Sequence, residues 1–205
     1  MKPILALIAG LVIALGAHAQ ELAPDVLIKS VTEQVLDVAR NDKDIQAGSS
    51  KRAIEVVETK VLPYFDFTRM TRLALGREWR QASSAQRQAL TEGFQSLLVR
   101  TYSKALTEYR NQSIDYKPLK MQDGAADVKV SAEIKQPGRK PIQLDYYLER
   151  QDKGWKVYDI EVEGISLIAN YRASFAAEIS RGGIDGLIQS LQAKNKSNEL
   201  ASAKK

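Results

Sequence analysis

The sequence predicts an α+β fold in which a curved, four-stranded antiparallel sheet is covered by a layer of helices. Apolar residues recur at helical spacing from residue 24 to about 110, and again from 166 to 194. Between residues 114 and 162 they alternate with polar residues instead, and turn signals interrupt the pattern. A sheet with one apolar face must bury that face, and the helices before and after it in the sequence can cover it.

The first helices are expected between Pro24 and Pro63. Proline suits the first turn of a helix, so one helix begins at Pro24. A second apolar stripe follows the polar stretch 41–50 and ends at Pro63, which cannot continue a helix. The next segment, 63–81, carries a dense set of large apolar residues and is expected to form a turn and a short helix that ends near Gly76.

The longest helix is expected to run from a cap at Ser83 and Ser84 to about Arg110. Apolar residues at helical spacing form one stripe along it, and this stripe is expected to face the interior. The stripe consists of Leu90, Phe94, Leu97, Leu98, Thr101, Tyr102, Ala105, Leu106 and Tyr109.

Four strands joined by short hairpins are expected from Ile114 onward. Pro118 suits an edge strand, because proline cannot donate to a ladder of hydrogen bonds. The fourth strand, Trp155–Val162, changes the parity of its apolar residues, so a β-bulge is expected near Asp159. The turn signals between the strands are Asp123-Gly124, Pro137-Gly138 and Asp152-Lys153-Gly154.

Two further helices, 166–181 and 184–194, are expected after the sheet, separated by Gly182 and Gly183. The polar tail 195–205 is expected to be disordered. Residues 20–194 are then expected to form a single domain, long enough to bury a core without disulfides.

The N-terminus has the pattern of a secretory signal peptide. Lys2 precedes an apolar run, 4–15, and the small-x-small sequence Ala17-His18-Ala19 follows. This run is short for a membrane span, which needs about 20 residues. Residues 1–19 are therefore expected to be removed by cleavage after Ala19.

The mature chain would contain neither histidine nor cysteine, because the only histidine, His18, leaves with the signal peptide. Nucleophiles of the Ser-His and Cys-His types are thereby excluded, as are ordinary zinc and copper sites. No oxygen-rich cluster indicates another metal. The formal net charge is +5, and the basic residues are spread along the chain apart from the C-terminal lysines. This pattern argues against a nucleic-acid partner and is compatible with a weak attraction to anionic membrane surfaces.

The residues alone leave three classes of function open. From the residue pattern alone, an ordinary core accounts for the inward apolar residues and is favoured over a ligand cavity. A binding protein, a solid-core adaptor of membrane complexes and a Tyr/Asp enzyme of the isomerase or hydrolase type are therefore all compatible. An inward-facing Asp159 near Tyr146 or Tyr158 would favour the enzyme, whereas a wholly apolar cavity would exclude it. Asp145 and Glu149 are expected on the outer face of the sheet.

Two stretches resemble the hallmark segments of the MlaC family of periplasmic phospholipid-binding proteins, also called the toluene-tolerance auxiliary family. They are VLPYFDFTRMTRLALGREWRQAS (61–83) and WKVYDIEVEGISLIANYRASFAAEISRGGIDGLIQSL (155–191). The resemblance covers nearly the whole mature chain in the same order of elements. It implies a deep apolar pocket between sheet and helices that holds phospholipid acyl chains.

The resemblance also implies a biological role. Such a protein is a soluble, non-enzymatic periplasmic carrier with phospholipid as cargo and no cofactor. It moves lipid between an outer-membrane lipoprotein–porin complex and an inner-membrane ABC transporter, which maintains outer-membrane lipid asymmetry and solvent tolerance. We expect the carrier to be a monomer. A diacyl lipid has about 30 methylenes, and exposing them to water costs on the order of 20 kcal/mol, so a carrier must enclose them.

We selected the residues expected to contact acyl chains by the direction in which their side chains face. They are not positions transferred from the family. Met70 and Leu73, with Ile165, Ile168 and Tyr171, are expected to close the mouth of the pocket. Arg172 or Arg100 could attend the phosphate, although a surface role is favoured for each. The full set of expected lipid contacts is Met70, Leu73, Phe94, Leu97, Leu98, Tyr102, Val130, Tyr146, Leu148, Ile160, Val162, Ile165, Ile168 and Tyr171.

Overall fold

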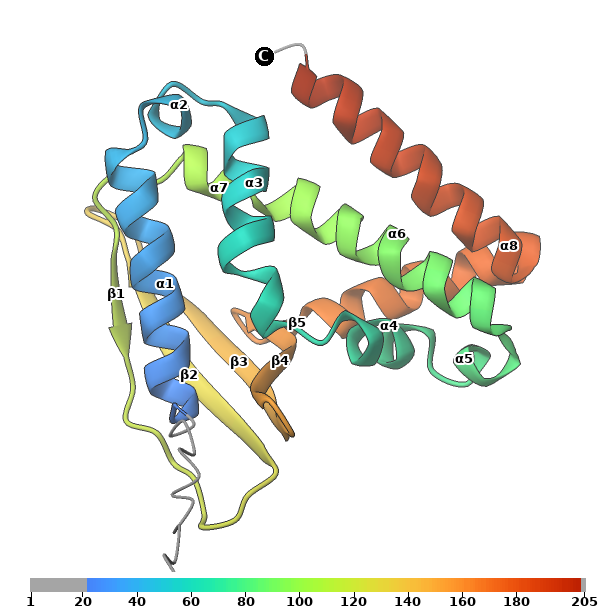
Figure 1. The fold of residues 1–205 in the computed structure, drawn as a ribbon, viewed down its shortest axis with the longest axis horizontal. Helices are drawn as coiled ribbons and strands as arrows, with labels where there is room; N and C mark the ends of the chain where they lie inside the picture. Colours follow the sequence, from blue (N-terminus) through green and yellow to red (C-terminus); the bar gives the residue numbers. More distant parts are fainter. Residues whose placement is uncertain (1–21, 204–205) are drawn as a thin grey trace, which may run out of the picture.

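The computed structural model describes residues 22–203 and has the predicted α+β architecture. Figure 1 shows the sheet on one side of the molecule with helix α1 lying across it, while α4, α5, α6 and α8 pack together on the other side. The helices are α1 (Pro24–Asn41), α2 (Lys43–Gln46), α3 (Ser50–Lys60), the 3-10 helix η1 (Leu62–Tyr64), α4 (Phe67–Leu75), α5 (Glu78–Gln81), α6 (Ser84–Tyr102), α7 (Lys104–Thr107) and α8 (Leu167–Ala203).

The sheet is an antiparallel meander with strands in the order β1-β2-β3-β4-β5. It has five strands rather than the expected four, because Ile165 and Ser166 pair with the end of β4. A two-residue strand is too short to produce an alternating pattern in the sequence. The first strand is at the edge, as expected, and it ends just before Pro118. The strands are β1 (Ser113–Tyr116), β2 (Asp127–Lys135), β3 (Ile142–Gln151), β4 (Gly154–Val162) and β5 (Ile165–Ser166).

The irregularity expected in the fourth strand is confirmed as a β-bulge. Tyr147 pairs with Asp159, whereas the next residue on β3, Leu148, pairs with Val157. Tyr158 is therefore the additional residue of β4, one position from the expected site. The bulge explains why the inward parity changes between Val157 and Ile160.

The long helix begins where expected and ends earlier. The Ser83 hydroxyl accepts from the Gln86 backbone N–H at 3.2 Å, and the Gln86 side chain accepts from the Ser83 N–H at 2.9 Å, which forms a capping box. The helix stops at Tyr102 instead of near Arg110, and the separate short helix α7 follows Ser103. The Ser103 hydroxyl donates to the Val99 carbonyl at 2.6 Å, a local bond that competes with helix continuation.

The C-terminal region differs from expectation in one respect. Gly183 has φ 67° and ψ −168°, so the predicted break in the terminal helix is confirmed. Where a disordered tail is expected from Asn195, α8 continues through Ala203, and residues 204–205 lie outside the described residues. The Asn195 amide donates to the Gly93 carbonyl of α6 at 2.9 Å, and this bond fixes the start of the polar segment to the helical layer.

The expected signal peptide, residues 1–19, lies outside the described residues. Within residues 22–203 no helix is both long enough and apolar enough to cross a membrane.

Candidate functional site

The apolar interior next to the sheet is divided into two clusters that meet at Phe65. Phe65 packs against both. We call the first the helix cluster; its buried members are Met70, Ala74, Leu75, Ala82, Leu90, Phe94, Leu97, Leu98, Ile168, Phe175, Leu187 and Leu191. We call the second the sheet cluster; its buried members are Leu27, Ile28, Val128, Val130, Leu148, Trp155 and Val157.

Most of the expected lipid contacts belong to these clusters. The helix cluster contains or directly contacts Met70, Leu73, Phe94, Leu97, Leu98, Ile168 and Tyr171. The sheet cluster contains or contacts Val130, Tyr146, Leu148 and Ile160. The structure thus brings eleven of the fourteen residues into two adjoining apolar groups, one contributed mainly by helices and one mainly by the sheet.

Three expected contacts lie outside both clusters. Ile165 is 64% exposed and Tyr102 is 45% exposed, while Val162 is half-buried at the end of β4. Met70 and Ile168, by contrast, are 1% and 3% exposed inside the helix cluster. Of the residues expected at the mouth, only Ile165 is therefore openly accessible to solvent.

An aromatic group occupies the middle of the helix cluster. The Phe94 ring lies 4.9 Å from the Tyr171 ring and 5.0 Å from the Phe175 ring, both in edge-on geometry. Burial, together with the neighbouring Tyr102, raises the pKa of Tyr171 to about 12. Phe175 was missed by sequence reasoning, although its spacing four residues after Tyr171 places both on one helix face.

Asp159, the carboxylate considered for a Tyr/Asp enzyme, is held by its own neighbours. Its carboxylate accepts hydrogen bonds from the Ile168 N–H at 3.2 Å and from the Ser166 hydroxyl, next to the first turn of α8. The partner of Tyr146 across the sheet is Ile160, and burial raises the pKa of Tyr146. The Asp159 side chain therefore anchors the start of α8 and makes no hydrogen bond to Tyr146. Burial, and to a lesser extent the charges of Asp127 and Asp159, raise the pKa of Tyr158.

Polar contacts fix α4 between the sheet and α8. The Asp66 N–H donates to the Val157 carbonyl at 2.9 Å, and the Gln151 amide donates to the Asp66 carboxylate at 2.7 Å. Arg69 pairs with Asp127 at 3.1 Å and lies over the Tyr158 ring. Sequence reasoning did not single out Arg69, because its partners are distant in the chain.

The two arginines considered for a phosphate have protein partners. The Arg172 guanidinium donates twice to the Leu73 carbonyl, at 3.1 and 2.9 Å, near the C-terminal end of α4. Arg100 lies 3.3 Å from the Ser96 hydroxyl and 3.9 Å from Glu199. Each side chain therefore already has a structural contact.

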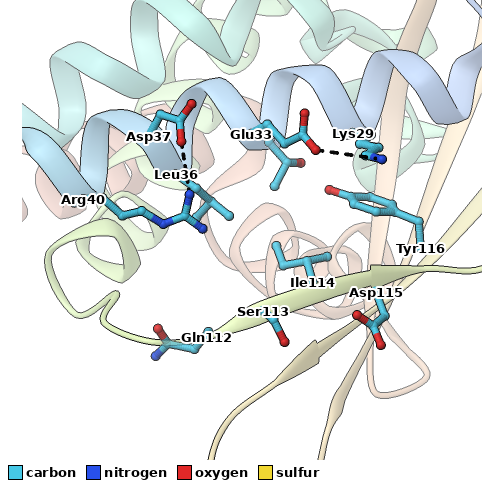
Figure 2. A pocket seen from close by; sticks show the side chains of 11 residues that line it. Lys29, Glu33, Leu36, Asp37, Arg40, Gln112, Ser113, Ile114, Asp115 and Tyr116 are labelled. Carbon is cyan, nitrogen blue, oxygen red and sulfur yellow. Dashed lines mark hydrogen bonds and ion pairs between the residues drawn. The ribbon is translucent and has the colours of Figure 1, made fainter.

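The surface pockets lie away from the expected lipid contacts. A groove of about 760 Å³ runs between α1 and β1 and is lined mainly by polar side chains. In Figure 2, Tyr116 and Ile114 point from β1 toward α1, whose face carries the ion pairs Lys29–Glu33 and Arg40–Asp37. Neither this groove nor three smaller polar pockets include any expected lipid contact. In this structure most of the expected lipid contacts pack against other protein atoms.

Among the residues that the structure describes, no group of three or more Asp or Glu side chains is placed to hold a metal ion.

The fold and the candidate site together define an α+β protein with an apolar interior divided between a sheet layer and a helix layer. The family model for the MlaC protein matches residues 29–193. The chain therefore belongs to the MlaC family.

Similar proteins agree with this assignment. The chain is 28% identical over 181 residues to the intermembrane phospholipid transport system binding protein MlaC of Haemophilus influenzae, covering 84% of this chain and 82% of that one. It is 30% identical over 187 residues to the toluene tolerance protein ttg2D of Pseudomonas putida, covering 86% and 84%.

A solved structure is also similar. The phospholipid-binding protein from Ralstonia solanacearum, determined in complex with a phospholipid, is 38% identical to this chain with a TM-score of 0.81. The match covers 87% of this chain and 99% of that one.

Proposed function

We propose that this chain is a soluble periplasmic carrier that binds phospholipid by its acyl chains. In this proposal, it moves lipid between an outer-membrane lipoprotein–porin complex and an inner-membrane ABC transporter, and so maintains outer-membrane lipid asymmetry. The observation that carries the proposal is the phospholipid bound in the similar Ralstonia protein, of which the match covers 99%.

The acyl chains are proposed to lie between the helix cluster and the sheet cluster. These clusters supply aliphatic and aromatic surface from both layers, which suits a ligand that needs enclosure rather than directed polar contacts. The side chains pack against one another in the structure described, so bound acyl chains replace contacts between protein atoms. Phe65, which packs on both clusters, lies at their junction.

Lipid content is the direct test. The mature protein is purified from periplasm without detergent, and native mass spectrometry is followed by organic extraction. We expect one or two phospholipid molecules per chain. A clean protein mass with no extractable lipid contradicts the proposal.

A paired substitution tests the location of the lipid. Ile160→Asp places a carboxylate in the sheet cluster. Bound acyl chains would surround this charge with apolar groups, which is energetically costly, so co-purified lipid is expected to fall at least tenfold. Val38→Asp is the matched control, because Val38 is also half-buried but packs on a separate apolar cluster formed by α1, α2 and α3. Equal lipid content in two folded variants contradicts the assigned location.

The mass of the exported protein tests the signal peptide. Cleavage after Ala19 removes residues 1–19 and leaves Gln20 at the N-terminus. A periplasmic protein that retains its N-terminal methionine contradicts this part of the proposal.

A further inference from the structure

Arginine is concentrated at one end of the helical layer. Residues 67–88 contain five arginines and one glutamate, a net charge of +4, while the formal net charge of the whole chain is +5. This segment forms α4, α5 and the first turn of α6, which lie together at the right of Figure 1. The expectation of evenly spread basic residues is therefore wrong for this end of the molecule.

Some of these arginines are used inside the protein. Arg69 reaches the sheet and pairs with Asp127. Arg87 donates to the Trp79 carbonyl at 2.9 Å and to the Arg80 carbonyl at 3.2 Å, beside the C-terminal end of α5. Neither side chain is free to meet an external partner.

Four other arginines face solvent, and we call Arg72, Arg77, Arg80 and Arg172 the arginine surface. Arg77 pairs with Glu78 at 3.0 Å. Within the described part of the chain, Arg72 and Arg80 have no carboxylate within 4.0 Å. Arg172 donates to the Leu73 carbonyl and so brings a further positive charge to the end of α4.

Arg72 and Arg80, which no carboxylate neutralises in the described part of the chain, favour an anionic partner. The planar fork of arginine matches phosphate oxygens, and each basic residue near an anionic bilayer strengthens binding about fivefold. Building on the proposed carrier function, we propose that the arginine surface holds the protein against a bilayer that contains anionic phospholipid.

The position of the arginine surface fits this role. Arg72 is exposed on α4, while Met70 of the same helix is 1% exposed inside the helix cluster. An α-helix is about 10 Å in diameter, so contact through α4 brings the proposed acyl-chain site within one helix width of the headgroups. None of the four surface pockets described above includes these arginines. Charges displayed outside a pocket suit an extended headgroup layer better than a single carboxylate.

Vesicle binding tests the inference. The full mature protein is mixed with vesicles of phosphatidylglycerol and phosphatidylcholine, or of phosphatidylcholine alone, at low and high salt, and bound protein is measured by co-sedimentation. We expect binding only to the anionic vesicles, weakened by salt because charges are screened. The double variant Arg72→Ser/Arg80→Ser is expected to bind about thirtyfold more weakly.

A charge-matched control separates this surface from net charge. Arg139→Ser/Lys140→Ser also removes two positive charges, but from the exposed turn between β2 and β3. Its vesicle binding is expected to stay within about twofold of the parent. An equal loss in both variants overturns the inference. Absence of binding by the parent protein also overturns it, in favour of an acidic protein partner.

Co-purified lipid is measured in the same samples. We expect both double variants to retain the phospholipid of the parent, so that weaker vesicle binding reports docking alone. A parent protein without lipid contradicts the proposed carrier function instead, and the vesicle result then stands separately.

Discussion

Asp145 illustrates how a charged side chain on the outer face of a sheet can still be buried. It alternates with inward apolar residues, as the sequence predicts, yet it is only 5% exposed. The Ser131 hydroxyl donates to its carboxylate, and the Lys129 ammonium lies 3.3 Å away. Burial alone would raise the pKa of Asp145, but these two neighbours outweigh it and hold the pKa below its usual value.

This pKa shift predicts a pH-dependent contribution to stability. A carboxylate with a lowered pKa stabilises the folded state at neutral pH, and that contribution is lost as the pH falls through the folded-state pKa. Asp145→Asn should cost about 1–2 kcal/mol at pH 7, and the difference should shrink toward pH 3. Urea unfolding at both pH values measures it. Asp115→Asn, which breaks an exposed ion pair with Lys135, is the control and should cost less than about 1 kcal/mol. A cost for Asp145→Asn that does not change with pH contradicts the assignment.

At the scale of elements, the break in α8 determines how the helical layer is built. Gly183 adopts φ 67°, a conformation that L side chains rarely adopt, and the chain reverses so that both halves of α8 contact α6. Tyr171 and Phe175 of the first half pack on Phe94, while Asn195 of the second half binds the Gly93 carbonyl.

Alanine substitutions should distinguish the break from the adjacent helix. Gly183→Ala is strained in the native conformation and should destabilise the protein by about 1–3 kcal/mol. Gly186→Ala is the matched control, because its added methyl meets no atom within 4 Å and the residue lies in a regular helix. It should stabilise the protein by up to about 1 kcal/mol. Thermal unfolding measures both; destabilisation by both would indicate that another property of this segment matters.

At the scale of the whole molecule, the proposed cargo should stabilise the fold. A ligand that binds only the folded state at about 100 times its Kd contributes about 2.7 kcal/mol, which is roughly 5–10 °C in Tm for a chain of this size. Removal of lipid should therefore lower Tm by about this amount, and adding phospholipid back should restore it. Ile160→Asp, which is expected to lack lipid, should show no such change. An unchanged Tm in the parent protein after complete lipid removal contradicts the proposed enclosure of the cargo.

Features of the fold that are determined by neighbouring residues could be predicted from the sequence. Local chemistry predicted the cap at Ser83, the break at Gly183 and the bulge near Asp159, because each needs only neighbouring residues. The two-residue strand β5 and the helical tail could not be predicted. The strand is too short to produce an alternating pattern, and the tail is fixed by the bond from Asn195 to Gly93, 102 residues away.

The candidate site was predictable to a similar extent. The periodicity of helices and strands predicted which apolar side chains point inward. Phe94 and Val130 are examples, and both are 0% exposed in the structure. It could not divide them between two clusters, identify Phe65 as their junction, or place Arg69 over Tyr158, because those relations arise from tertiary packing.

The contact of both halves of α8 with α6 also leads us to expect an order of events during folding. Asn195 and Gly93 are 102 residues apart, whereas β2, β3 and β4 are joined by short hairpins. Contacts between distant residues form late, because a long loop must close before they are made. The sheet can thus assemble from neighbouring segments, whereas the helical layer is complete only when the C-terminal part of the chain is present. We therefore expect the helix cluster, one wall of the interior proposed to hold lipid, to be completed only after the C-terminal segment has been synthesised.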